Sequence, residues 1–190
     1  KTKNRILTGS LSDKSKVLLD MGNPIFDWNK IPLSKKIDPG NVDIEIDGEK
    51  ISFGFCVNVG NPHIIFFNVF NESFDKFYRQ LENFGPKIEN HKLFPEKVNV
   101  TFASIVNKEH IVVRVWERGA GLTKACGTAA CATAVAANKL KLVKNAVTID
   151  FHDNLKGERE GLFISIEPEP VNKIFMIGHA GGPSKIELEV

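Results

Sequence analysis

The sequence has few cysteines, little net charge and no long apolar run. Three cysteines in 190 residues are too few, and odd in number, for a disulfide framework. No Cys-x-x-Cys pair occurs, and the histidines do not fall at zinc-ligand spacings. The net charge of +2, with Lys and Arg scattered among acids, indicates neither a nucleic-acid nor a membrane partner. No apolar stretch approaches the roughly 20 residues that span a bilayer. The odd cysteine count fits free thiols in a reducing compartment, so we expect a cytoplasmic protein.

Motifs for phosphate and cofactor binding are also missing. The Gly-Ala-Gly segment at 119–121 lacks the third glycine of a dinucleotide-binding loop, and no Gly-Lys-Ser/Thr occurs. We therefore expect no cofactor and no metal. The basic start, KTKNRILTGS, lacks the apolar segment of a secretory signal. It also lacks an initiator Met, so we expect a processed start or a chain that begins partway through a longer protein.

Short alternating runs dominate what is present and predict strands. Gly, Asn and Pro separate these runs, as is typical of turns. The predicted strands are 16–22, 41–48, 51–60, 63–69, 98–106, 110–117, 146–152, 161–167, 173–178 and 185–190. Many strands with few helices indicate the α+β class.

Only two segments are predicted to be helical. Residues 73–84 place five aromatic and aliphatic side chains on one face, with Ser73 as the N-cap and Gly85-Pro86 as the terminator. Such an amphipathic helix covers a sheet from outside. Residues 127–140 are apolar nearly all round and mostly alanine, which is typical of a helix buried on every side. We expect a sheet curled around this central helix.

Cys126 lies at the start of the alanine-rich helix, in the string ERGAGLTKACGTAACA. The first amides of a helix have no intrahelical partner, and the dipole there is positive. We expect this position to lower the thiol pKa and to hold a substrate carboxylate on the amides of Gly127 and Thr128. The residues would then move a proton on the neighbouring carbon. The alternative is that Cys126 is only a small buried hydrophobic residue. This interpretation is the favoured one for Cys131 and Cys56.

A second group of polar residues lies upstream. Asn61 and His63 flank a proline in VGNPHIIFF, where a turn and a capping histidine are the alternatives to a functional role. Asn99 alternates with valines in EKVNVTF, and it could simply be solvated. A cysteine hydrolase that pairs Cys126 with His63 is a further hypothesis, although no residue that would orient the histidine is obvious.

Together, ERGAGLTKACGTAACA, GNPH and FPEKVNVTF closely resemble the C-terminal half of the diaminopimelate epimerase family. The resemblance implies two similar lobes, each a mostly antiparallel, curled sheet around a central helix, with the active site between them. It implies interconversion of LL- and meso-2,6-diaminopimelate, in lysine and cell-wall biosynthesis, without pyridoxal phosphate. Two cysteines on opposite sides of the substrate α-carbon would exchange its proton, one as thiolate and one as thiol.

The resemblance also assigns roles to residues. By this likeness Cys126 is one of the two acid/base cysteines, and His63 is the histidine near the reacting centre. The implied substrate-binding residues are Asn61, Asn99, Glu117, Arg118, Gly127 and Thr128. The planar guanidinium of Arg118 suits the distal carboxylate.

One feature of the family pattern is missing. The first catalytic cysteine of the family lies in a Cys-Gly-Asn motif of the N-terminal lobe, which does not occur here. We therefore expect residues 1–20 to be a remnant of that lobe, 21–175 the C-terminal lobe, and 176–190 a segment that returns to the missing lobe. The chain alone is expected to be inactive, and its lobe-facing surface could form a homodimer. Alternatives are a proline-type racemase of the same fold and a non-catalytic remnant.

Overall fold

A computed structural model describes residues 7–11, 15–68, 73–152 and 160–180. Within these residues, eleven strands form one sheet in the order β1-β2-β11-β10-β9-β7-β6-β5-β4-β3, with β8 paired to β7. The strands are β1 (Thr8–Leu11), β2 (Lys16–Gly22), β3 (Val42–Ile46), β4 (Glu49–Asn58), β5 (Pro62–Phe67), β6 (Asn99–Asn107), β7 (His110–Glu117), β8 (Gly121–Thr123), β9 (Ala146–Phe151), β10 (Leu162–Ile166) and β11 (Ile174–His179). The helices are α1 (Phe74–Glu89) and α2 (Gly127–Lys139).

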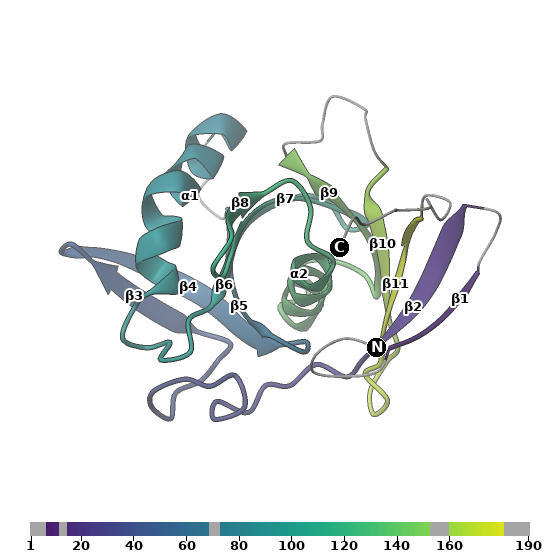
Figure 1. The fold of residues 1–190 in the computed structure, drawn as a ribbon, viewed down its shortest axis with the longest axis horizontal. Helices are drawn as coiled ribbons and strands as arrows, with labels where there is room; N and C mark the ends of the chain where they lie inside the picture. The colour runs from purple at the N-terminus through teal and green to yellow at the C-terminus, as the bar shows by residue number, and fades with distance from the viewer. Residues whose placement is uncertain (1–6, 12–14, 69–72, 153–159, 181–190) are drawn as a thin grey trace, which may run out of the picture.

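The sheet curls around α2, as Figure 1 shows. Most neighbouring strands are antiparallel, while β5 runs parallel to β6 and β7 runs parallel to β9. The predicted α+β class and the mostly antiparallel, curled sheet around a central helix are confirmed. The strands predicted between residues 16 and 178 all form. The predicted strand 185–190 lies outside the described residues.

Helix α2 is threaded through the curl because its side chains are small. Every residue from Ala129 to Ala137 is buried. All of them except Thr133 belong to one apolar cluster with inward side chains of β4, β5, β7, β9 and β10. Alanine lets the surrounding backbone approach on all sides, so the sheet can close tightly around the helix axis. Burial of Cys131, at 0% exposed, agrees with its interpretation as a core residue.

Helix α1 packs on the outer face of the same sheet, away from α2 (Figure 1). Phe77, Tyr78 and Leu81 are buried there against the outward side chains of β6 and β7. Cys56 belongs to this outer cluster and is 0% exposed, as expected for a core residue. Neither helix is long and apolar enough to cross a membrane in the described part of the chain.

The predicted end of this helix at Gly85-Pro86 is wrong, because α1 continues to Glu89 with Pro86 inside it. Proline near a helix end removes one backbone hydrogen bond. Tertiary contacts in the following turn offset that loss, since Ile88 is fully buried and Glu89 is 5% exposed. Two short strands, β1 and β8, had no counterpart in the sequence prediction.

Candidate active site

Cys126 is the N-cap of α2, as the sequence predicts. Its backbone is extended, with φ −146° and ψ 110°, and the helix begins at Gly127. The first intrahelical bond runs from the amide of Ala130 to the carbonyl of Cys126, at 3.0 Å. The amides of Gly127, Thr128 and Ala129 therefore have no intrahelical acceptor. One of these three donors, the amide of Ala129, bonds the sulfur of Cys126.

Three neighbouring strands bring polar side chains to this helix start. His63 on β5 lies beside Asn99 on β6, in parallel register. Val100 on β6 pairs with Trp116 on β7, which puts Asn99 next to Glu117. Along β7, Val113 and Val115 face α2, so the alternation of a strand also turns Glu117 toward the helix. Residues that are distant in sequence thus meet at one end of the curled sheet.

Hydrogen bonds link His63 to the sulfur of Cys126 through two side chains. His63 Nε2 lies 2.9 Å from Asn61 Oδ1, and Asn61 Nδ2 donates to Thr128 Oγ1 at 3.2 Å. Thr128 Oγ1 lies 3.5 Å from Cys126 Sγ. In this arrangement His63 Nε2–H donates to Asn61 and Asn61 donates to Thr128, so the Thr128 hydroxyl keeps a proton that a thiolate at Cys126 would accept. The described contacts therefore connect Cys126 and His63 indirectly, and not as the hydrogen-bonded pair that a cysteine hydrolase uses.

His63 is neutral in this setting. Burial, together with a smaller effect of the Arg118 charge, lowers its pKa to about 3. Nδ1 of His63 is buried with no hydrogen-bond partner among the described residues. A neutral imidazole that donates through Nε2 carries a lone pair on Nδ1. His63 Nδ1 is thus a hydrogen-bond acceptor without a partner among the described residues, next to the hydrogen bonds that lead to the Cys126 thiol.

The expectation that the helix start lowers the pKa of Cys126 is wrong. Burial raises that pKa to about 11, because a thiolate is poorly solvated in an apolar setting. Hydrogen bonds from the Thr128 hydroxyl and the Ala129 amide lower it, while the neighbouring Glu117 carboxylate raises it. The side chain is 8% exposed. Near neutral pH, Cys126 is therefore a thiol that holds its proton.

Asn99 and Arg118 are tied to each other. Asn99 is 3% exposed, which excludes the interpretation that it is simply solvated. Its amide donates to the carbonyl of Pro62 at 2.8 Å, and its Oδ1 accepts from the backbone amide of Arg118 at 2.9 Å. Arg118 Nη1 donates to the carbonyl of Glu96 at 2.8 Å. Asn99 thus joins the Asn61–His63 segment to the turn that carries Arg118.

Two residues near the site were not anticipated. A Cβ on Gly127 would lie 3.1 Å from Met176 Cε and Sδ, so the β11 thioether covers one side of the helix start. Glu89 accepts hydrogen bonds from Trp116 and Gly119, on both sides of Glu117 and Arg118. Met176 lies far away in sequence and left no local signal. The helical period 77, 81, 84 and 88 continues past Gly85, and it could have brought Glu89 into α1.

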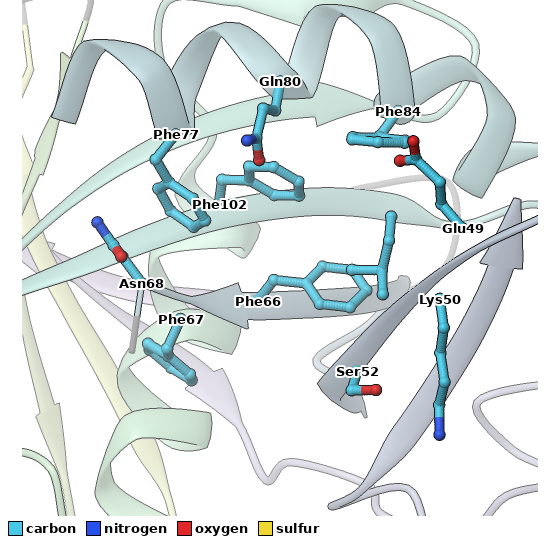
Figure 2. Close-up of a pocket in the computed structure, with 11 residues that line it drawn as sticks. Glu49, Lys50, Ser52, Phe66, Phe67, Asn68, Phe77, Gln80, Phe84 and Phe102 are labelled. Atoms are coloured by element: carbon cyan, nitrogen blue, oxygen red, sulfur yellow. The ribbon is translucent and has the colours of Figure 1, made fainter. Parts of the chain in front are cut away.

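The hollow between α1 and the outer face of the sheet is a different feature. It has a volume of about 260 Å³, and Figure 2 shows Phe77, Gln80 and Phe84 directed from the helix toward Phe66 and Phe102. None of the predicted site residues lines it. Among the described residues, no three His, Cys, Asp or Glu side chains form a group that could hold a metal ion. The predicted site residues therefore do not line this hollow; they lie at the start of α2, within the curled sheet.

Comparisons with known proteins agree with this geometry. A sequence profile of diaminopimelate epimerase matches residues 55–181. A diaminopimelate epimerase of Pelagibacter ubique is 54% identical over 155 residues, which cover 77% of this chain and 55% of the relative. One from a Bradyrhizobium strain is 48% identical over 133 residues, which cover 68% of this chain and 45% of the relative. The chain thus spans about half the length of the curated relatives it matches.

A solved structure shares the fold. A probable proline racemase from Agrobacterium radiobacter aligns with a TM-score of 0.62 at 10% sequence identity. The alignment covers 100% of this chain and 62% of that one. At this identity the likeness concerns the fold alone.

Proposed function

Because the chain belongs to the diaminopimelate epimerase family, we propose that the protein of which it is part interconverts LL- and meso-2,6-diaminopimelate. The reaction would proceed without a cofactor, in the cytoplasm, within lysine and cell-wall biosynthesis. One observation carries the proposal for this chain: Cys126 lies at the start of a buried helix, with donors and the Glu117 carboxylate directed at it. This arrangement suits proton transfer at a carbon that bears a carboxylate.

The start of α2 offers a place for that carboxylate. Of the three amides without an intrahelical acceptor, that of Ala129 bonds the sulfur. The amides of Gly127 and Thr128 remain for a substrate carboxylate beside the thiol. Negative charge that develops when the α-proton leaves would be stabilised by the same donors. We propose Gly127 and Thr128 as the residues that hold the reacting carboxylate.

Proton transfer needs one group on each face of the α-carbon. A thiol with a pKa of about 11 is protonated near neutral pH and can deliver a proton to a carbanion. In the opposite direction, Cys126 would lose its proton to the nearby Glu117 carboxylate and act as the base. We propose that the second sulfur comes from the N-terminal lobe. The sulfur that takes the α-proton becomes a thiol, and the sulfur that returns a proton to the other face becomes a thiolate. Within the substrate, only this C–H bond breaks and forms again.

The remaining polar residues would position the substrate and the two sulfurs. Asn61 orients Thr128, and Asn99 holds the turn of Arg118. Arg118 has guanidinium hydrogens beyond the one bonded to Glu96, which suit the distal carboxylate of diaminopimelate. The bare Nδ1 of His63 is an acceptor through which His63 would take part in the transfer of the proton.

We also propose how the chain divides. Residues 21–175 would form the C-terminal lobe, while 1–20 and 176–190 would join the lobe that supplies the second sulfur. The pairing of β2 with both β1 and β11, at one end of the sheet, supports a shared origin of these segments. Residues 1–6, 12–14 and 181–190 lie outside the described part. The 190-residue chain alone should not epimerise, and ordinary turnover by it would contradict the two-lobe proposal.

The test is an isomerisation assay on the complete protein, with LL-diaminopimelate and with L-proline as separate substrates. Interconversion of diaminopimelate, but not of proline, is expected. The absence of interconversion by the complete protein would reject the proposed function. Turnover of proline alone would replace it with a racemase of the same fold.

A further inference from the structure

Glu89 is a buried carboxylate in the last turn of α1, and it accepts three contacts. Trp116 Nε1 donates to Oε2 at 2.7 Å, and the amide of Gly119 donates to Oε1 at 2.9 Å. The ammonium group of Lys97 lies 3.6 Å from Oε1. A carboxylate at this end of a helix faces the negative end of the dipole, and its burial costs further free energy. Such a carboxylate persists only where its bonds offset these costs.

The backbone of α1 is shaped to receive Trp116. A Cβ on Gly85 would lie 2.8 Å from Cγ and Cδ2 of the indole, so only glycine allows the ring to rest on the helix there. Gly85 and Glu89 are four residues apart and share one face of the helix. The ring that packs against Gly85 is thereby directed so that its N–H meets the carboxylate of Glu89.

These contacts hold the turn that carries the site residues. Trp116 faces outward from β7, where it packs with the outer cluster, while Glu117 is turned inward toward Cys126. The amide of Gly119 directly follows Arg118, and Gly119 has a φ of +77° that favours glycine. Glu89 therefore holds the indole of Trp116 on one side of Glu117 and Arg118, and the backbone amide of Gly119 on the other. Because Glu89 fixes Trp116 and Gly119, it also fixes the position of Glu117, which points to the inner face of the sheet.

We propose that Glu89 is a positioning residue, which sets the Glu117 carboxylate beside the Cys126 thiol through Trp116 and the Gly119 amide. This inference rests on the proposed function as far as catalysis is concerned. The effect of Glu117 on the thiol does not depend on turnover. Because the Glu117 carboxylate disfavours the Cys126 thiolate, a Glu117 that leaves its place should make Cys126 more reactive.

The test compares Glu89→Gln with Glu82→Gln in the complete protein. Both residues lie on α1, but the Glu82 carboxylate pairs with Arg114 at 2.8 Å, away from the turn. Two readouts are measured: kcat/KM for diaminopimelate, and the rate of Cys126 alkylation by iodoacetamide, followed by mass spectrometry of its peptide. We expect Glu89→Gln to lower kcat/KM by about ten- to a hundredfold. It should raise the alkylation rate at pH 8 by about three- to tenfold, and Glu82→Gln should change neither.

A second variant covers the case in which Glu89→Gln fails to fold. Trp116→Phe keeps the aromatic packing on Gly85 but removes the indole donor, and it should change both readouts in the same direction. Wild-type values of kcat/KM and of Cys126 alkylation in folded Glu89→Gln or Trp116→Phe would overturn the proposal. If the wild-type protein does not epimerise, the proposed function fails, while the alkylation rates still test the role of Glu89.

Discussion

The side-chain amide of Asn61 donates a hydrogen bond to the hydroxyl of Thr128 across 67 positions of sequence, at 3.2 Å. This bond makes Thr128 an acceptor on one side and leaves its own proton for Cys126 Sγ, 3.5 Å away. In the series His63, Asn61, Thr128, each side chain then donates to the next one in the direction of the sulfur. A thiolate formed at Cys126 would be met by a hydroxyl and a backbone amide, although burial keeps the resting state a thiol.

Replacement of Thr128 by valine tests this hydroxyl. Thr128→Val keeps the shape but removes the donor that lowers the Cys126 pKa. We expect Cys126 in the chain to alkylate about three- to tenfold more slowly at pH 8 to 9. Thr133→Val is the matched control, since Thr133 is buried on the same helix and its hydroxyl has no partner among the described residues. Equal rates in the two variants would show that the Thr128 hydroxyl does not reach the sulfur.

Glu117→Gln should separate reactivity from catalysis. Loss of the negative charge lowers the pKa of Cys126, because Glu117 raises it in the wild type. Alkylation of Cys126 at pH 8 should therefore accelerate. Epimerisation by the complete protein should fall by about a hundredfold or more, since the acceptor of the thiol proton is gone. If alkylation slows, or if turnover is retained, Glu117 does not act on Cys126 in the proposed way.

The buried neutral His63 predicts lower stability in acid. Its folded-state pKa of about 3 lies below the ordinary value of 6.5, so between these values the unfolded chain binds the extra proton. The stabilisation is complete above about pH 6.5 and is lost as the pH falls toward 3. The free energy of unfolding should decrease by about 1.4 kcal/mol for each pH unit in this window.

Urea titrations of the chain from pH 7 to pH 4 measure this slope. His63→Gln keeps a side-chain N–H for Asn61 but cannot take up a proton in this range. Its stability should therefore depend less steeply on pH, by the same increment. Parallel curves for the two proteins would mean that His63 is not held neutral by the fold.

The Gly85→Ala substitution has two opposite effects on stability, one through helix propensity and one through packing. Alanine is favoured over glycine inside a helix by about 1 kcal/mol. Its Cβ would overlap the Trp116 ring, and overpacking costs about 1 to 3 kcal/mol. We expect a net loss of stability in thermal unfolding, together with a changed Trp116 fluorescence. Asn83→Ala, at an exposed position of α1, is the control and should be neutral or stabilising.

Local patterns predicted the elements better than their boundaries. The alanine run of α2 and the position of Cys126 before it follow from neighbouring residues, and the structure confirms both. The end of α1 depends on distant contacts of Ile88 and Glu89, which outweigh the local Gly-Pro signal. The short strands β1 and β8 exist through pairing with β2 and β7, which a run of three or four residues does not reveal.

The site residues were found by their likeness to a family, and their arrangement required the fold. Alternation alone places Asn99 on one face of β6, but only the parallel register with β5 brings it beside His63. The Cys126 pKa could not be predicted from the sequence for the same reason: the sequence indicates the helix start but not the burial of the thiol. Burial dominates, so the direction predicted from the helix start was wrong.

The role of Cys126 is tested most directly by exchange of the substrate α-proton in the complete protein. LL-diaminopimelate is incubated in D₂O, and deuterium and configuration at the α-carbon are followed by NMR and chiral chromatography. We expect inversion with uptake of one deuterium in the wild type and in Cys131→Ala, whose sulfur lies within the buried helix. In Cys126→Ala, inversion should fall by at least about a hundredfold, whereas inversion at the wild-type rate would contradict the assignment of this thiol.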